Sequence, residues 1–263
     1  MKTLLETMDL RKTYQIGKIG VEALRGVNLR IREGELTAIM GPSGCGKSSL
    51  MHILGAMTKA TSGKVLIEGD DIADMNDSQL TGIRRDKIGF VFQKFNLLPT
   101  LTARGNIDAA LHIKGTKNTH GDHLAETLQL LMIEDKMGRK PSELSGGEQQ
   151  RVAIARAVAS KPAILLADEP TGSLDSKNSE IVSNMFRELN RRFKQTIVLV
   201  THNPELVTFT DRLIEMRDGV IVSDNDPSWD TESELAQPSF SVGPTGRPPT
   251  HDAVYEEILN VDV

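Results

Sequence analysis

Residues 41–48 read Gly41-Pro42-Ser43-Gly44-Cys45-Gly46-Lys47-Ser48 and fit the pattern G-x-x-x-x-G-K-[ST]. An apolar run at residues 36–40 precedes them and apolar residues at helical spacing follow, which predicts strand, loop and helix in that order. In this context the glycines allow backbone N–H groups to surround an anion, and Lys47 adds a positive charge. The stretch therefore predicts a nucleotide-phosphate loop, with the Ser48 hydroxyl available to Mg²⁺. A chance glycine-rich turn is the alternative, expected in roughly 1% of chains of this length.

Strand and helix patterns alternate on both sides of this loop. Strands are predicted over residues 27–31, 36–40, 65–67, 87–92, 163–167 and 196–200, with a closing hairpin around residues 218–219. Helices are predicted over residues 50–57 and 181–189. From about residue 101 to 159 the apolar spacing is mostly helical, which predicts an inserted subdomain. Strand–helix alternation around apolar runs is typical of a mostly parallel α/β sheet.

An acidic pair follows the apolar run at residues 163–167. A carboxylate directly after a buried strand can reach the phosphate loop, so Asp168 is a candidate to hold Mg²⁺. Glu169, the next residue, is a candidate general base that polarises an attacking water. An ordinary acidic strand end is the alternative for the pair taken alone. The phosphate loop makes the functional interpretation the stronger one.

A third motif, LSGGEQQR at residues 144–151, is predicted to open a helix. Ser145 with Glu148 three residues later matches a capping box. The box leaves the Gly146-Gly147 pair unexplained, because glycine weakens a helix start. A helix N-terminus with bare N–H groups can bind phosphate. Since residues 41–48 serve their own chain, Ser145, Gly146, Gly147 and Glu148 are predicted to contact a nucleotide held by a partner chain.

The order of these motifs resembles the nucleotide-binding subunit of ABC transporters over residues 4 to about 222. The resemblance rests on the phosphate loop, Gln93, LSGGEQQR, LLADEPTGSLD (residues 165–175) and Thr201-His202. It implies an α/β fold, namely a P-loop NTPase (ABC ATPase) core with an N-terminal antiparallel β-subdomain and an inserted α-helical subdomain. It also implies ATP and Mg²⁺ as cofactors, and ATP hydrolysis as the activity.

The resemblance assigns further site residues position by position. Tyr14 matches the aromatic that stacks on adenine, against the alternative of a strand-edge tyrosine. Gln93 matches the residue that reaches Mg²⁺ and the attacking water, and His202 matches the one that contacts the γ-phosphate. Asp175 matches the aspartate at the dimer interface, and Ser49 follows the Mg²⁺ ligand Ser48. The catalytic set is then Glu169, His202 and Gln93, and the metal set is Ser48, Gln93 and Asp168.

Longer stretches, IMGPSGCGKSSLMHILG and GFVFQKFNLLPTLTARGNI, resemble the lipoprotein-releasing and macrolide-exporter branch (LolD and MacB). The departures are Cys45, Ser49 and Ser173, and none removes a catalytic group. Because no stretch of this chain can cross a membrane, we expect a free-standing subunit of the LolD kind. The resemblance then implies a head-to-tail homodimer enclosing two ATP, and an integral membrane permease subunit on a separate chain. The segment 96–106, expected to be helical, would take up a coupling helix of that permease.

Two alternatives belong to other functional classes. One is a regulatory ATPase like FtsE, which acts on a membrane partner in cell division without moving a solute. The other is a soluble, non-transport ABC ATPase. DNA-repair members need long coiled-coil insertions and translation members usually carry two cassettes, which leaves the iron–sulfur assembly members as the nearest of this class.

Composition bounds the remaining possibilities. A formal charge of −5 argues against nucleic-acid binding, and a single cysteine agrees with a cytoplasmic protein, here expected at the inner face of the membrane. Residues 221–263 carry nine acidic residues against one arginine, and five of the eleven prolines. Together with this change in composition, the resemblance implies an ABC ATPase domain at 1–225, with its core at 1–93 and 160–225 and the helical subdomain at about 94–159. Residues 226–263 form an acidic, Pro-containing extension, either irregular or with a short amphipathic helix at 253–259.

Overall fold

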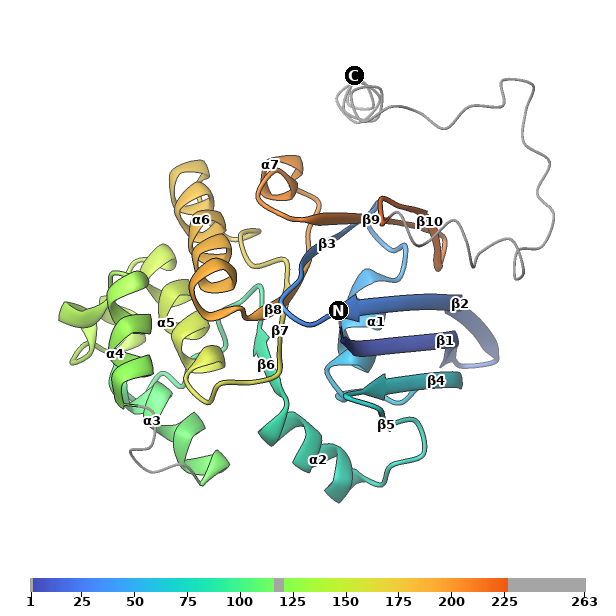
Figure 1. Ribbon diagram of the computed structural model, residues 1–263, viewed down its shortest axis with the longest axis horizontal. Coiled ribbons are helices and arrows are strands. Elements are labelled where there is room, and N and C mark those ends of the chain that lie inside the picture. Colours follow the sequence, from blue (N-terminus) through green and yellow to red (C-terminus); the bar gives the residue numbers. More distant parts are fainter. Residues whose placement is uncertain (1, 116–120, 227–263) are drawn as a thin grey trace. The chain divides into compact units, whose positions relative to one another are not determined.

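The computed structural model describes residues 2–115 and 121–226 (Figure 1). The chain divides into two units, residues 1–226 and residues 227–263, and only the first falls within the described part. The predicted extension and its amphipathic helix therefore lie outside the described residues, apart from Asp226.

A six-stranded sheet forms the centre of the first unit, in the order β10-β9-β3-β8-β7-β6. The strands are β3 (Leu36–Met40), β6 (Ile88–Val91), β7 (Ile164–Asp168), β8 (Thr196–Val200), β9 (Arg212–Arg217) and β10 (Val220–Asp224). All neighbours pair in parallel except β10, which forms the predicted hairpin with β9. The carboxyl ends of β3, β8, β7 and β6 therefore meet at one edge, where ligands bind in open α/β sheets.

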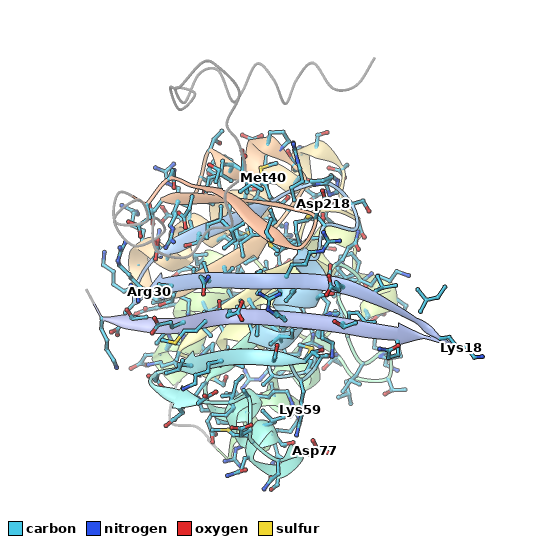
Figure 2. All side chains as sticks on the ribbon, turned by 90° about the vertical axis from the view of Figure 1, so that its right-hand side faces the viewer. Lys18, Arg30, Met40, Lys59, Asp77 and Asp218 are labelled. Atoms are coloured by element: carbon cyan, nitrogen blue, oxygen red, sulfur yellow. The ribbon has the colours of Figure 1, made fainter. Side chains whose placement is uncertain are left out.

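A second, antiparallel sheet has the order β2-β1-β4-β5. Its strands are β1 (Thr3–Ile16), β2 (Ile19–Arg32), β4 (Ser62–Ile67) and β5 (Asp70–Asp71). Figure 2 shows the long β1–β2 hairpin from the side, with Lys18 at its tip. This sheet is the N-terminal antiparallel β-subdomain that the family resemblance implies.

Helices cover both faces of the central sheet. They are α1 (Lys47–Leu54), α2 (Asp77–Asp86), α3 (Ala103–Lys114), α4 (Gly121–Leu130), α5 (Gly146–Val158), α6 (Ser176–Phe193) and α7 (Pro204–Val207), with short 3₁₀ turns at Glu134–Lys136 and Pro141–Glu143. Strand β7 shows the division, because Ile164 and Leu166 pack with α1 whereas Leu165 and Ala167 pack with α5 and α6. In Figure 1, α1 accordingly lies between the two sheets, and α5 lies on the far side of the central sheet.

Two sequence predictions of helix are wrong in their bounds. The first helix ends at Leu54 rather than near Met57, because Gly55 caps it and Met57 lies outside, partly exposed. Residues 96–106 are not one helix, since α3 begins at Ala103 after Thr102, whose side chain accepts a hydrogen bond from the Gly105 N–H. The residues before Thr102 form an irregular loop. Within the described residues, no helix is long and apolar enough to cross a membrane.

Candidate functional site

The phosphate loop turns from buried strand β3 into helix α1. Gly46, the N-cap of α1, has φ 104°, and a Cβ there would collide with the Ala23 carbonyl of β2, so only glycine fits. The Lys47 side chain is buried, and its ammonium donates hydrogen bonds to the carbonyls of Gly41 (2.5 Å) and Pro42 (2.9 Å). The cation that sequence analysis assigns to the phosphates therefore lies inside the loop.

Asp168, at the end of β7, lies beside this loop. The Ser48 hydroxyl and an Asp168 carboxylate oxygen are 3.4 Å apart. Burial raises the pKa of Asp168, and His52, Ser48 and Lys47 oppose that shift. No role was predicted for His52, which lies four residues after Ser48 on α1 and is a neighbour of Asp168.

These oxygens fit a magnesium ion. Within the described part of the chain no three His, Cys, Asp or Glu residues cluster as a metal cage. Mg²⁺ needs no such cage, since it is usually held by one or two carboxylates together with substrate phosphates. The paired hydroxyl and carboxylate of Ser48 and Asp168 are hard oxygen donors of that kind.

Removing the partly buried charge of Asp168 should stabilise the metal-free protein. Because the folded pKa of Asp168 is raised, the stability linked to its protonated form is lost as pH rises through that pKa. Asp168→Asn is therefore expected to raise Tm at pH 8 in EDTA, and the gain should shrink as pH falls toward 3.8, the ordinary carboxyl value. Thermal unfolding from pH 8 down to about pH 4 measures this, with exposed Asp77→Asn as control. A gain that grows as pH falls would contradict the assignment.

Glu169 and His202 face one another across the ends of β7 and β8. The Glu169 N–H donates to the Val200 carbonyl at 2.9 Å, which ties the residue to β8, and its φ is 49°. His202 Nδ1 lies 2.6 Å from the Glu169 carboxylate. The carboxylate is mostly buried, with 18% of its side chain exposed, whereas 68% of the imidazole is exposed. A carboxylate and an imidazole in contact can hold and move one proton.

Gln93 follows β6 and lies exposed at the same edge. A Cβ built on Gly172 would be 2.8 Å from the Gln93 amide nitrogen, so the side chain lies against the loop after Glu169. The Ser173 hydroxyl donates to the Gln93 backbone carbonyl at 3.3 Å. The structure thus brings residues 41–48, Asp168, Glu169, Gln93 and His202 to one sheet edge.

Tyr14 lies on the antiparallel sheet near the phosphate loop. It pairs with Val21 of β2, two residues before Ala23, whose carbonyl touches Gly46. Residue Tyr14 is 37% exposed, and the Lys12 ammonium lies 4.8 Å from the centroid of its ring. One face of the ring is thereby covered by a cation. The position is compatible with the predicted stacking role, and it also matches the alternative of a strand tyrosine.

The Ser145–Glu148 segment lies across the sheet from the phosphate loop. Ser145 is the N-cap of α5, and a full capping box links it to Glu148. Backbone and side-chain hydrogen bonds with Ser145 lower the Glu148 pKa, as does Lys136, at 3.6 Å from the carboxylate. Since α5 and α1 pack on opposite faces of the central sheet, one chain does not bring its own Ser145 to its own phosphate loop.

The two glycines after Ser145 differ in their surroundings. A Cβ at Gly147 would overlap the side-chain amide of Asn178, which belongs to α6. A Cβ at Gly146 would have its nearest neighbours, the Leu174 and Phe95 side chains, at 3.7 Å, an ordinary contact distance. Packing within this chain therefore explains why residue 147 is a glycine. It does not explain the glycine at residue 146, where another molecule can approach the backbone.

Alanine at these two positions should separate folding from function. Gly147→Ala is expected to lower stability by about 1–3 kcal/mol through overpacking. Gly146→Ala should leave Tm unchanged or raise it, because alanine favours helix by about 0.5–1 kcal/mol, and it should still impair ATP-dependent self-association. Thermal unfolding and size-exclusion chromatography with ATP measure the two effects. Normal association of Gly146→Ala would remove Gly146 from the partner contact.

Asp175 also has a role within its own chain. It is the N-cap of α6, and its carboxylate accepts hydrogen bonds from the backbone N–H and side-chain amide of Asn178, both at 2.8 Å. These bonds lower its pKa. Asn178 thus contacts both Asp175 and Gly147, a link that sequence analysis missed. Its only sequence signal is the position three residues after an N-cap aspartate.

Comparison with known proteins places this site in a family. The family model described as ABC transporter matches residues 24–172. The lipoprotein-releasing system ATP-binding protein LolD of Geobacter metallireducens is 45% identical over 85% of this chain and 100% of its own length. The macrolide export ATP-binding/permease protein MacB of Syntrophobacter fumaroxidans is 42% identical over 95% of this chain but only 35% of its own length.

The third relative has been solved as a dimer. MJ0796 of Methanocaldococcus jannaschii, an ABC transporter ATP-binding protein, is 45% identical over 83% of this chain and 95% of its own length. Its dimeric cassette structure superposes with a TM-score of 0.78, at 43% identity over 85% of this chain and 98% of that chain. A second dimeric structure of MJ0796 is a post-hydrolysis state bound to ADP and Pi, with a TM-score of 0.77.

These matches confirm the predicted P-loop fold, and they confirm the resemblance to ATP-hydrolysing subunits of the LolD and MacB type. The family model alone covers more than half of the chain. The chain therefore belongs to the ABC transporter family.

Proposed function

We propose that this chain binds and hydrolyses ATP, and that it powers a membrane subunit by ATP-driven closure of a homodimer. The observation that supports this most directly is the division of the site between the two faces of the sheet. The phosphate loop and Ser145 cannot meet within one chain, and MJ0796 is a dimer. In a head-to-tail dimer each ATP contacts residues 41–48 of one chain and Ser145–Glu148 of the other.

The proposed residue roles follow from chemistry. Lys47 and the loop N–H groups bind the phosphates, and Tyr14 stacks on the base with the ring face opposite Lys12. Ser48, Asp168 and Gln93 hold Mg²⁺, which neutralises phosphate charge when bound. Glu169 accepts a proton from the attacking water, and His202, in contact with Glu169, orients that carboxylate and contacts the γ-phosphate. Asp175 lies at the dimer interface.

The partner is proposed to be an integral membrane subunit on a separate chain, which would hold this protein at the inner face of the membrane. The loop at residues 94–102 and helix α3 would receive it. The LolD and MacB relatives support export or lipoprotein release over an FtsE-like regulatory role or a soluble non-transport role. Domain bounds of 1–225, with a helical subdomain at about 94–159, remain part of the proposal.

Two measurements test this function. Purified protein should release phosphate from ATP with Mg²⁺ but not with EDTA, and Lys47→Ala should abolish release while Lys64→Ala on the exposed side of β4 should not. Affinity purification in mild detergent should then yield a subunit with several membrane-spanning segments. Phosphate release unaffected by Lys47→Ala would refute the ATPase assignment, and a soluble partner would favour the non-transport alternative.

A further inference from the structure

The loop that carries Gln93 contains two consecutive residues in the left-handed conformation. Phe95 has φ 48° and Asn96 has φ 49°. Asparagine tolerates this region, but a bulky aromatic residue adopts it only where its surroundings enforce it. Only Lys94 separates Gln93 from Phe95. The conformation of this pair therefore sets the course of the backbone directly after Gln93.

Arg156 of helix α5 contacts both of these residues. One guanidinium nitrogen donates to the Asn96 carbonyl at 2.5 Å and the other to the Phe95 carbonyl at 3.1 Å. The side chain is half-buried, and burial lowers its pKa. Across residues 2–115 and 121–226 no carboxylate pairs with Arg156. A partly buried cation needs polar partners, and here the two loop carbonyls supply them.

The geometry suits arginine. Arginine presents its N–H donors on separate nitrogens of a rigid planar fork, whereas lysine presents all of its donors on one nitrogen at the end of a flexible stem. Two different guanidinium nitrogens of Arg156 bind the two successive carbonyls, so the rigid fork fixes how these carbonyls lie relative to one another. Because both carbonyls belong to left-handed residues, the two bonds hold the pair in that conformation.

The same loop is also held elsewhere. Ser173, in the loop after Glu169, donates to the Gln93 carbonyl. A Cβ built on Gly146, at the start of α5, would lie 3.7 Å from the Phe95 ring, so the ring lies close to this end of the helix. The segment Gln93–Asn96 is thus fixed between the loop of the catalytic carboxylate and the helix that begins at Ser145.

We propose that Arg156 is a positioning residue for Gln93, which acts by holding the backbone of Phe95 and Asn96 directly after it. This inference rests on the proposed ATPase function. Arg156 touches neither residues 41–48 nor Tyr14, so its loss should leave ATP binding intact. The effect should fall on kcat, because misplacement of a catalytic group by about 1 Å can cost about 10²-fold in rate.

Arg156→Met, Arg156→Lys and the matched control Arg187→Met, on the exposed side of α6, test the proposal. Hydrogen exchange of residues 94–98 in nucleotide-free protein should rise about tenfold in Arg156→Met. The value of kcat should fall at least about tenfold with KM within about twofold. Arg156→Lys, which keeps the charge but not the planar fork, should be intermediate, and Arg187→Met should match the parent protein. In a Gln93→Ala background, Arg156→Met should cause no further loss of kcat.

Unchanged exchange at residues 94–98 would overturn the proposal, whatever the ATPase result. Increased exchange with unchanged kcat would also overturn it, because the loop would then be held without positioning Gln93. Additive losses in the double variant would show that Arg156 acts elsewhere. If Arg156→Met unfolds, hydrogen exchange will be faster throughout the chain. The same measurements are then made on Arg156→Lys. If the parent protein hydrolyses no ATP, the proposed function fails, whereas the exchange experiment still tests the Arg156 contact.

Discussion

Replacement of Glu169 by glutamine is expected to lower ATP turnover by about 10²–10⁴-fold, the usual contribution of a general base. The amide keeps the shape of the side chain and its contact with His202 Nδ1, but it cannot accept the proton of the attacking water. ATP binding should survive, because residues 41–48 and Asp168 are unchanged. Dimers formed with ATP and Mg²⁺ should therefore persist. Phosphate release and size-exclusion chromatography on the same preparation measure both effects.

The control for this variant is Glu180→Gln, which makes the same chemical change on the exposed face of α6. It should leave turnover and dimerisation as they are in the parent protein. Retained turnover in Glu169→Gln would remove Glu169 from its role as base. Loss of ATP-dependent dimers in Glu169→Gln would instead assign the carboxylate a part in assembly.

Replacement of Ser145 by aspartate should abolish ATP-dependent dimerisation while leaving the fold intact. Ser145 is exposed and caps α5, and aspartate caps a helix about as well as serine does, so Tm should stay within a few degrees of the parent protein. In the proposed dimer the new carboxylate would meet the partner's phosphates, and like charges in contact cost several kcal/mol. The dimer dissociation constant should therefore rise at least about 10²-fold.

Ser145→Asn is the matched variant, because asparagine also caps helices but carries no charge. It should dimerise better than Ser145→Asp at equal Tm, and analytical ultracentrifugation with ATP and EDTA measures the difference. Binding of ATP to the monomer should be equal in both variants. Equal dimerisation of the aspartate and asparagine variants would contradict a phosphate contact at Ser145.

The buried strands of the central sheet were predictable to the residue in two cases. Residues 36–40 and 196–200 are mostly apolar, with one threonine in each run, and all five residues of each strand are buried. Strand β1 was not predicted as a segment. Its pairing with β2 shifts register at several points, including between Thr7 and Leu10, so the period-two alternation is lost. The helix expected at residues 96–106 begins only at Ala103, where Thr102 caps it, and Asn96 at the start of the expected segment has a positive φ. Arg156, which bonds to the Phe95 and Asn96 carbonyls, is far away in sequence.

The site residues were named from motifs, and the capping box of Ser145 and Glu148 was predicted from their spacing and is confirmed. The second role of Asp175, which caps α6 of its own chain as well as being assigned to the dimer interface, was not predicted. Gly147 makes room for Asn178, a residue on another helix. Such contacts depend on how α5 and α6 pack, which spacing along the chain does not encode.

The hydrogen bonds of Lys47 affect how strongly the loop at residues 41–48 binds an anion. Because the Gly41 and Pro42 carbonyls already accept hydrogen bonds from the Lys47 ammonium, which has three N–H donors, a phosphate that forms an ionic contact with Lys47 must share or displace these neutral acceptors. The enthalpy gained at Lys47 is then the difference between two hydrogen-bonded states. Simple anions such as sulfate should consequently compete poorly with ATP. Tight binding should require a ligand that contacts both residues 41–48 and Tyr14.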